Sequence, residues 1–294
     1  MDAKRDTYLV KPDPQDPRLT ERVKGVDQNG APVETSVTVE RALTIFLNSQ
    51  EIVTAMTIND YPDYLAIGYL LNQNMLQADD VVIGVDYDEE LAVVVVRTER
   101  PTDYEAKLKK KVQTSGCAQG TVFGDLMEVI ENAKLPSTEL RTSWLYALTH
   151  AINTTPSLYL EAGAIHGCVL AKQDRPLVYM EDVGRHNAVD KIAGWMFKER
   201  VAPDDKIFYT TGRLTSEMVI KCVRMGIPIL ISRSGFTAWG VELARKANLT
   251  LIGRARGKRF VALAGESRIV FDQDLDYVEE ESAKHRRKAA VHDD

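Results

Sequence analysis

The apolar positions of the chain follow one pattern in its first third and another after Ser137. In the first third, β-branched and apolar residues cluster in four short runs that predict two pairs of strands. The predicted strands lie at residues 36–48, 51–58, 81–87 and 91–99. Between the two pairs, Asn59 and Asp60 can cap a helix whose first turn holds Pro62. This part is therefore expected to form a small α+β unit.

After Ser137 short apolar strands alternate with helical segments. Residues Leu140, Trp144, Leu148 and Ile152 recur at helical spacing and predict one apolar helix face. The strands that follow are apolar throughout, as expected when both faces of a sheet are covered. Strands that alternate with helices predict an α/β fold with a largely parallel sheet between two helical layers.

Changes in composition divide the chain further. The first residues are polar and hold three closely spaced prolines, and the last ones are charge-segregated, which indicates loosely held ends. The predicted parts are a flexible N-terminal arm (1–34), an N-terminal α+β domain (35–115), a connector that carries the Cys117 loop (116–136), a C-terminal α/β domain (137–270) and a charged tail (271–294).

Charge and composition exclude several functional classes. Forty-three acidic residues against 37 basic ones leave a formal net charge of −6, which argues against a general nucleic-acid-binding protein. Three scattered cysteines are too few for a disulfide framework, and there is no apolar leader and no run of 18 apolar residues. The expectation is a soluble cytoplasmic protein without a membrane span. Nucleotide-binding glycine loops, zinc motifs and the serine-hydrolase elbow are absent from the sequence.

One dense polar cluster, residues 181–191, follows a predicted strand and opens a helix. At such junctions of α/β sheets ligands meet helix N-termini. Gly184 would let the backbone approach a ligand and Arg185 suits a phosphate. His186 lies near the helix start, and Asp190, one turn later, is predicted to hold its ring. The alternative is a capped helix with a surface ion pair.

Three further clusters end predicted strands. They hold hydroxyl and cationic side chains, which together indicate an anionic, phosphate-bearing ligand. The candidate residues are Arg213 and Ser216 in the first cluster, Ser232, Ser234 and Thr237 in the second, and Arg254, Ala255, Arg256, Gly257, Lys258 and Arg259 in the third. The competing interpretation is that the hydroxyls cap helices and that the cations form a solvated turn.

Cys117 is the candidate nucleophile. Gly116 and Gly120 flank it, and the lysines of 109–111 would favour its reactive thiolate form. An unreactive, half-buried thiol is the alternative. Cys168 and Cys222 lie in apolar patterns and are predicted to be core residues.

The motifs resemble those of the FdhD/NarQ family of formate dehydrogenase accessory proteins. Residues 181–191, EDVGRHNAVDK, resemble the family's hallmark, and AGAIHG resembles its glycine-rich strand with His166 at the histidine. The stretches 210–237 and 248–259 resemble its downstream turn and its basic cofactor-binding end. The resemblance covers about residues 35–265.

Membership in this family would imply a cytoplasmic homodimer that is required for formate dehydrogenase activity. Such a protein binds bis-molybdopterin guanine dinucleotide (Mo-bis-MGD) as a client cofactor and passes sulfur to it from a cysteine desulfurase. Here the catalytic persulfide would form on Cys117, as in a sulfurtransferase, and the four clusters would bind the guanine-nucleotide part of the cofactor. The resemblance also implies a C-terminal cytidine-deaminase-like three-layer α/β/α domain without zinc, and the formate dehydrogenase catalytic subunit as partner.

Two departures from the family pattern leave alternatives open. Many relatives carry a C-x-x-C pair, whereas Gly120 stands at the second cysteine position here, and SGFT replaces the commoner Ser-Ala-Pro-Thr turn. A chaperone that binds and protects the cofactor without transferring sulfur is therefore the second hypothesis. The third is an unrelated α/β enzyme that uses the His186–Asp190 pair.

Overall fold

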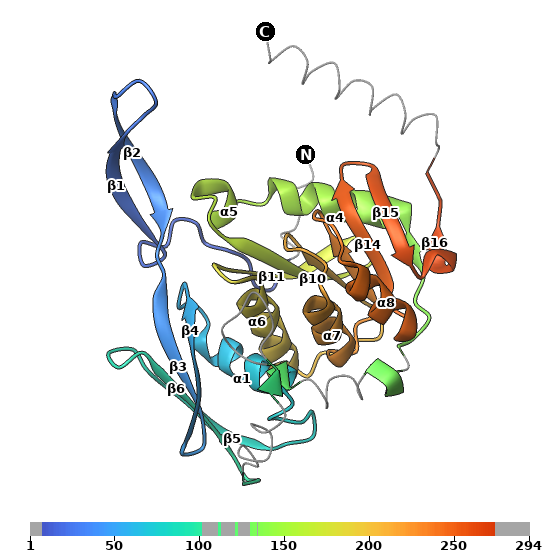
Figure 1. The fold of residues 1–294 in the computed structure, drawn as a ribbon, viewed down its shortest axis with the longest axis horizontal. Helices are drawn as coiled ribbons and strands as arrows, with labels where there is room; N and C mark the ends of the chain where they lie inside the picture. The colour runs from blue at the N-terminus through green and yellow to red at the C-terminus, as the bar shows by residue number, and fades with distance from the viewer. Residues whose placement is uncertain (1–7, 102–110, 113–120, 123–129, 134, 274–294) are drawn as a thin grey trace.

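The computed structural model describes residues 8–101, 111–112, 121–122, 130–133 and 135–273, with 111–112 and 121–122 described by their backbone alone. Figure 1 shows two units side by side, a small sheet with one helix and a larger sheet with helices on both faces. Among the described helices, none is long and apolar enough to cross a membrane.

The smaller unit is the α+β unit expected from the sequence. Its four strands lie in the order β4-β3-β6-β5, and α1 covers one face. The elements are β3 (Arg41–Leu47), β4 (Gln50–Thr57), α1 (Pro62–Asn72), β5 (Val82–Asp88) and β6 (Val93–Thr98). Pro62 opens the helix as predicted, but Tyr61 is the N-cap, with a left-handed φ of 47° and no side-chain cap. Asp60 instead pairs with a lysine of the larger unit.

The predicted N-terminal arm, residues 1–34, contains regular secondary structure in its described part. Strands β1 (Thr20–Val26) and β2 (Pro32–Thr38) form a projecting hairpin (Figure 1). Asp27 Oδ1 accepts hydrogen bonds from the turn amides of Asn29 and Ala31, and Gly30 has a φ of 76°. Upstream, backbone hydrogen bonds attach residues 9–10 to the edge of β11. Backbone pairing therefore holds a segment whose composition alone indicated disorder.

The larger unit is built on a six-stranded sheet in the order β11-β10-β12-β13-β14-β15. The strands are β10 (His166–Lys172), β11 (Arg175–Asp182), β12 (Lys206–Thr210), β13 (Ile229–Ser232), β14 (Thr250–Arg256) and β15 (Arg259–Ala264). Only the β12–β13 and β13–β14 pairs are parallel, so the expectation of a largely parallel sheet was wrong for the flanks. Tight turns join β10 to β11 and β14 to β15, and such turns require antiparallel pairing.

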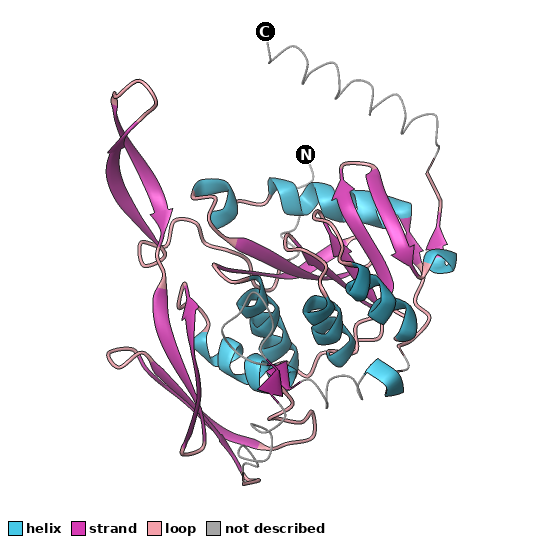
Figure 2. Ribbon diagram, in the orientation of Figure 1, coloured by secondary structure: helices cyan, strands magenta, loops and turns pink. Residues whose placement is uncertain are grey.

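Helices cover both faces of this sheet, which gives three layers (Figure 2). Within β12, Phe208 faces one apolar core, whereas Ile207 and Tyr209 face the other. The first face is covered by α6 (Arg185–Lys198), α7 (Ser216–Arg224) and α8 (Ala238–Lys246), and the second by α4 (Thr142–Thr154) and the short α5 (Leu158–Glu161). The α/β fold class is therefore confirmed at the level of a mixed α/β protein with several sheets.

Short elements complete the described fold. They are β7 (Lys111–Val112), β8 (Thr121–Val122), β9 (Leu140–Arg141), the 3₁₀ turn Glu266–Arg268 and β16 (Ile269–Val270). Strand β7 is paired to β8, and β9 is paired to β16. Leu140 thus lies in a strand and not on the predicted helix face. Asp272 accepts hydrogen bonds from Ser143 N and from the Thr142 hydroxyl at the start of α4. The first residues of the predicted tail are therefore anchored.

The two units meet through the close packing of α1 against α6. An added Cβ at Gly68 would lie 1.7 Å from the backbone oxygen of Asp190, and one at Gly194 would lie 2.0 Å from that of Tyr64. Only glycine allows two helix backbones to approach this closely.

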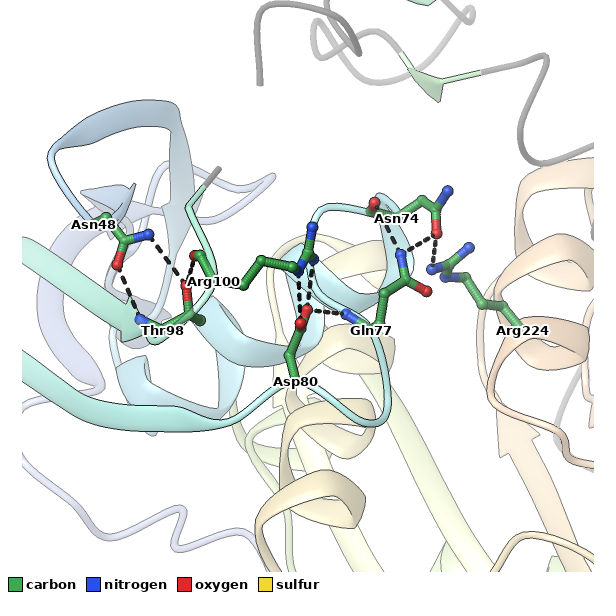
Figure 3. A network of polar contacts seen from close by, with 7 residues as sticks. All are labelled: Asn48, Asn74, Gln77, Asp80, Thr98, Arg100 and Arg224. Atoms are coloured by element: carbon green, nitrogen blue, oxygen red, sulfur yellow. Dashed lines mark hydrogen bonds and ion pairs between the residues drawn. The ribbon is translucent and has the colours of Figure 1, made fainter. Parts of the chain in front are cut away.

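A polar network joins the same units farther along the contact (Figure 3). Its members run from the turn after β3 to the C-terminal end of α7: Asn48, Thr98, Arg100, Asp80, Gln77, Asn74 and Arg224. Arg100 donates two hydrogen bonds to the Asp80 carboxylate, at 2.7 and 2.6 Å. Arg224 donates to Asn74 Oδ1 at 2.5 Å and to the carbonyl of Leu71. Polar contacts as well as apolar packing therefore fix the relative position of the units.

Candidate functional site

The candidate site is a pocket at the sheet edge where β11, β12, β13 and β14 end and β10 begins. It has a volume of about 390 Å³. We call it the arginine pocket, and its described lining is Tyr159, Gly163, Ala164, Ile165, His166, Val183, Thr211, Arg233, Ser234 and Arg256. The ends of neighbouring parallel strands and the turns after them form such pockets in α/β sheets, because they meet at one edge.

Two arginines give the pocket a positive charge, and its described lining contains no acidic residue. Within the described residues, neither Arg233 nor Arg256 forms an ion pair with a carboxylate. The guanidinium carbon of Arg233 lies 5.1 Å from the centre of the Tyr159 ring, which holds its plane at the pocket wall. Guanidinium groups without an acidic partner favour a phosphate or another oxyanion.

His166 lies at the inner side of the pocket among further cations. Burial, together with the charges of Arg185 and Arg213, lowers its pKa. Its Nδ1 is 3.4 Å from the hydroxyl of Thr211. Arg185 lies over Gly212, where an added Cβ would come within 3.0 Å of the arginine Cδ. Its buried Nε has no hydrogen-bond partner in the described structure. Arg185 and Arg213 thus lie near enough to His166 to affect its charge, while Ser234 and Arg256 line the pocket itself. The predicted role of these four residues in cofactor binding stays a prediction.

Other predicted ligand residues serve the fold instead. The Ser232 hydroxyl is fully buried, donates to the Gly212 carbonyl at 2.6 Å and accepts from Ser234 N at 2.9 Å. Thr237 caps α8 by accepting from Gly240 N. Ala255 is buried in the apolar core on the α4 side. In the described structure the hydroxyls of Ser232 and Thr237 thus serve local backbone groups, and the predicted role of these positions in ligand binding stays a prediction.

The basic cluster at residues 254–259 divides between strand and turn, and only Arg256 lines the arginine pocket among its described members. Arg254 is exposed and has a left-handed φ of 54°, where the pairing of β14 with β15 shifts register. Gly257 has a φ of 56° in the turn that also contains Lys258, and Arg259 begins β15 on the exposed side. Gly184 and Ser216 lie at the starts of α6 and α7, outside the lining of the pocket.

The predicted His186–Asp190 pair does not form. Nε2 of His186 lies 3.2 Å from Oε2 of Glu217 on α7, and burial lowers the pKa of this histidine. Asp190 receives Lys221 Nζ on both carboxylate oxygens, at 2.7 Å, and Asn72 Nδ2 at 2.7 Å. The spacing on α6 was correct, but helices packed against α6 supply the partners. This removes the pair on which the unrelated-enzyme hypothesis depended.

The charges of the hallmark segment lie instead in a second cluster, which we call the buried junction. It joins the smaller unit to the larger one and consists of Thr57, Asp60, Asn72, Asp182, Asp190, Lys191 and Lys221. Lys191 is fully buried, 2.6 Å from Asp182 Oδ2, and also pairs with Asp60. Although burial opposes its charge, these two carboxylates raise the pKa of Lys191. The Thr57 hydroxyl donates to Asp182 at 2.5 Å.

The structure describes two of the three cysteines, Cys168 and Cys222. Cys117 lies outside the described residues, so its predicted role stays a prediction. Cys168 and Cys222 are buried in the core, as predicted, and burial raises the pKa of both thiols, that of Cys168 to about 12. Among the described residues, no group of His, Cys, Asp or Glu side chains is arranged to hold a metal ion.

Sequence reasoning did not assign Tyr159, His166 or Arg233 to the site. The sequence marks His166 only as the histidine of the family's glycine-rich strand, directly after the glycine-containing segment 162–165. Arg233 stands between two serines that were singled out, so its position in a strand-end cluster was the available signal. Tyr159 carries no such signal because it comes from a short helix distant in sequence from the strand ends.

Comparisons with known proteins agree with the motifs. The sequence model of the FdhD/NarQ family matches residues 38–270. A sulfur carrier protein FdhD from Listeria innocua is 29% identical over 244 residues, which cover 81% of this chain and 92% of that protein. One from Bacillus subtilis is 28% identical over 240 residues, covering 81% and 91%.

A solved structure has the same fold. The crystal structure of a candidate formate dehydrogenase accessory protein from Desulfotalea psychrophila matches with a TM-score of 0.70 at 28% identity. The match covers 86% of this chain and 100% of that one.

Proposed function

The chain belongs to the FdhD/NarQ family, and on that premise we propose that it is a sulfur carrier that serves formate dehydrogenase. In this proposal the arginine pocket binds the guanine dinucleotide part of the client cofactor, Mo-bis-MGD. Cys117 receives sulfur from a cysteine desulfurase and donates it to the bound cofactor. The formate dehydrogenase catalytic subunit then receives the cofactor from the protein, which acts as a homodimer in the cytoplasm.

The observation that carries the proposal is the pair of arginines without acidic partners in the arginine pocket. Arg233 and Arg256 offer two guanidinium groups at one sheet edge. A diphosphate fits this arrangement because each guanidinium can bind an oxyanion through two N–H donors. The volume of about 390 Å³ suits part of a nucleotide rather than the whole cofactor. The cytidine-deaminase-like arrangement implied by the family belongs to the proposal as the scaffold of this pocket.

The sulfur step requires a single reactive cysteine. The Cys117 thiolate attacks the outer sulfur of the desulfurase persulfide, the S–S bond of the donor breaks, and the donor thiolate leaves. A persulfide forms on Cys117 without any net oxidation. The chemistry needs neither a second loop cysteine nor the two buried thiols of Cys168 and Cys222.

The experiment is intact-mass measurement after incubation with cysteine and a desulfurase that is active on a relative. We expect the wild-type protein to gain one sulfur that reductant removes, and Cys117→Ala to gain none. The Cys168→Ala variant is the matched control and should gain sulfur like the wild type. Absence of the gain in the wild-type protein would contradict the sulfur-carrier proposal.

Gly120, at the place of a second loop cysteine, favours a second candidate function, a cofactor chaperone without sulfur transfer. The two functions separate in a strain that lacks the protein. A chaperone predicts full formate dehydrogenase activity with Cys117→Ala and none with the double variant Arg233→Glu, Arg256→Glu. A sulfur carrier predicts loss of activity with both.

A further inference from the structure

Glu181 is a buried carboxylate that the proposed function does not use. It lies near the end of β11, is 2% exposed, and points toward the first turn of α5. Its Oε2 accepts a hydrogen bond from Leu158 N at 2.8 Å and its Oε1 accepts one from Tyr159 N at 3.0 Å. These are two of the amides at a helix start that have no partner within the helix.

The turn that Glu181 holds forms one wall of the arginine pocket. Tyr159 lies in this turn, and its ring faces the Arg233 guanidinium at 5.1 Å. Residues 163–165, which follow α5 after one residue, line the same pocket. The other contacts of this segment are the apolar packing of Leu158 and Ile165 and the local cap of Ser157 on Leu160 N. The carboxylate of Glu181 ties two amides of this turn to β11 and so contributes to the position of the Tyr159 ring.

Charged groups of several elements surround Glu181. Lys191 of α6 donates to its backbone oxygen at 2.9 Å, and Asp60 lies near it from the loop before α1. Tyr179 precedes it on β11. Glu181 also borders a cavity of about 370 Å³. The other charged residues that line this cavity are Lys11, Asp13, Asp16, Arg18, Asp60, Asp63 and Glu89. Burial raises the pKa of Glu181 to about 7, and Leu158 N, Tyr159 N and Lys191 oppose that rise.

We propose that Glu181 is a positioning residue of the arginine pocket: its ionised carboxylate fixes the α5 turn, and loss of that charge weakens anion binding at Arg233. The inference rests on the proposed function, because it takes the pocket to be an anion site. Protonation turns one carboxylate oxygen into a hydroxyl, which is a poorer acceptor for the amide that faces it. The Tyr159 ring is then held less firmly against Arg233.

Guanosine diphosphate is the probe, and binding is measured by calorimetry with Glu181→Gln, which keeps the side-chain shape. We expect Glu181→Gln to bind it about tenfold more weakly at pH 8, as expected for a lost charge-assisted hydrogen bond. The matched control is Glu161→Gln at the exposed end of the same helix, which should bind like the wild type. Between pH 8 and pH 6 the wild-type affinity should fall more than that of Glu181→Gln. The titration of the phosphate is common to both proteins and cancels in this difference.

Hydrogen exchange of the wild-type protein gives a second test that needs no substitution. The protection of the Leu158 and Tyr159 amides, corrected for intrinsic exchange, should decrease as the pH falls from 8 to 6. Constant protection would overturn the role of Glu181, and so would equal nucleotide affinity of the wild type and Glu181→Gln. In the latter case the proposed function stands, because the pocket still binds its probe. If neither protein binds guanosine diphosphate, the pocket assignment fails and the positioning role fails with it.

Discussion

Asp182 of the buried junction and Val183 of the arginine pocket are adjacent in the chain, yet the two regions use charge in opposite ways. In the buried junction every carboxylate of the hallmark segment has a partner: Asp182 receives Thr57, Asn187 and Lys191, and Asp190 receives Asn72 and Lys221. In the arginine pocket, Arg233 and Arg256 have no ion-pair partner among the described residues, and the Arg233 guanidinium lies against the Tyr159 ring. The difference shows that a charged motif at a strand end indicates a ligand only where its partners are missing.

The physical reason lies in the cost of burial. A charge removed from water must be compensated by a partner inside the protein. The buried junction supplies such partners from both units, Lys191 and Lys221 from the larger one and Asp60 from the smaller one. An exposed guanidinium at a pocket keeps its hydration until an anion replaces it. The buried junction therefore joins the two units, while the arginine pocket offers the charge that the proposed anion binding requires.

The largest effect should follow from removing the central cation of the buried junction. Lys191→Met leaves Asp182 and Asp60 buried without their partner, and we expect it to lower the free energy of unfolding by about 3–5 kcal/mol. Urea unfolding followed by circular dichroism measures the change. Lys198→Met is the matched control because its pair with Asp63 is partly exposed, and it should cost less than about 1 kcal/mol. Equal effects of the two substitutions would show that burial does not distinguish these pairs.

A substitution that changes no charge can separate the same two units at the contact between α1 and α6. Gly68→Ala places a Cβ against the backbone oxygen of Asp190, so α1 must move away from α6, at an expected cost of about 3 kcal/mol. Thermal unfolding is the measurement. Gly25→Ala in the projecting hairpin meets no atom within 4 Å and should change stability by less than about 0.5 kcal/mol. A stable Gly68→Ala protein would mean that the helices can separate at little cost.

Much of the fold was predictable because local patterns determine it. The paired strands β3 and β4, the helix that begins at Pro62 and the hairpin of β5 and β6 follow from alternation and turn residues within short windows. The projecting hairpin was missed although Asn29–Gly30, between two strand-like runs, is a turn signal. The antiparallel flanks of the large sheet were missed because apolar strands look alike whichever direction they run.

The site was predictable only in its residue types. Strand-end clusters correctly located Arg256 and Ser234 at one edge, since neighbouring strands of one sheet end together. Asp190 has two partners, Lys221 at a distance of 31 residues along the chain and Asn72 at 118 residues. No spacing within the hallmark segment reveals them. Likewise Ser232 and Thr237 satisfy local backbone groups, a competing use of hydroxyls that the sequence leaves open.

Substituting two arginines of the β14–β15 hairpin, Arg256 and Arg259, tests whether the pocket differs from the basic surface next to it. Arg256→Ala should weaken guanosine diphosphate binding about tenfold to a hundredfold, because a charge-assisted bond to phosphate is lost. Arg259→Ala should leave the affinity unchanged, since Arg259 is exposed outside the pocket. Both variants should unfold like the wild type, in contrast with Lys191→Met. Equal loss of affinity in the two variants would indicate general attraction by the basic turn instead of a defined pocket.

The smallest effect concerns the ionisation of His166. Burial, Arg185 and Arg213 lower its pKa, so protonating His166 costs more in the folded than in the unfolded protein. Its contribution to stability is therefore lost as the pH falls below about 6.5, the ordinary histidine value. A bound phosphate offsets the arginine charges, so guanosine diphosphate should raise the pKa of His166. Proton NMR of the histidine ring measures the change, with exposed His150 on α4 as a reference whose signal should not move on binding. A pKa of His166 that is insensitive to the nucleotide would place the anion away from the inner side of the pocket.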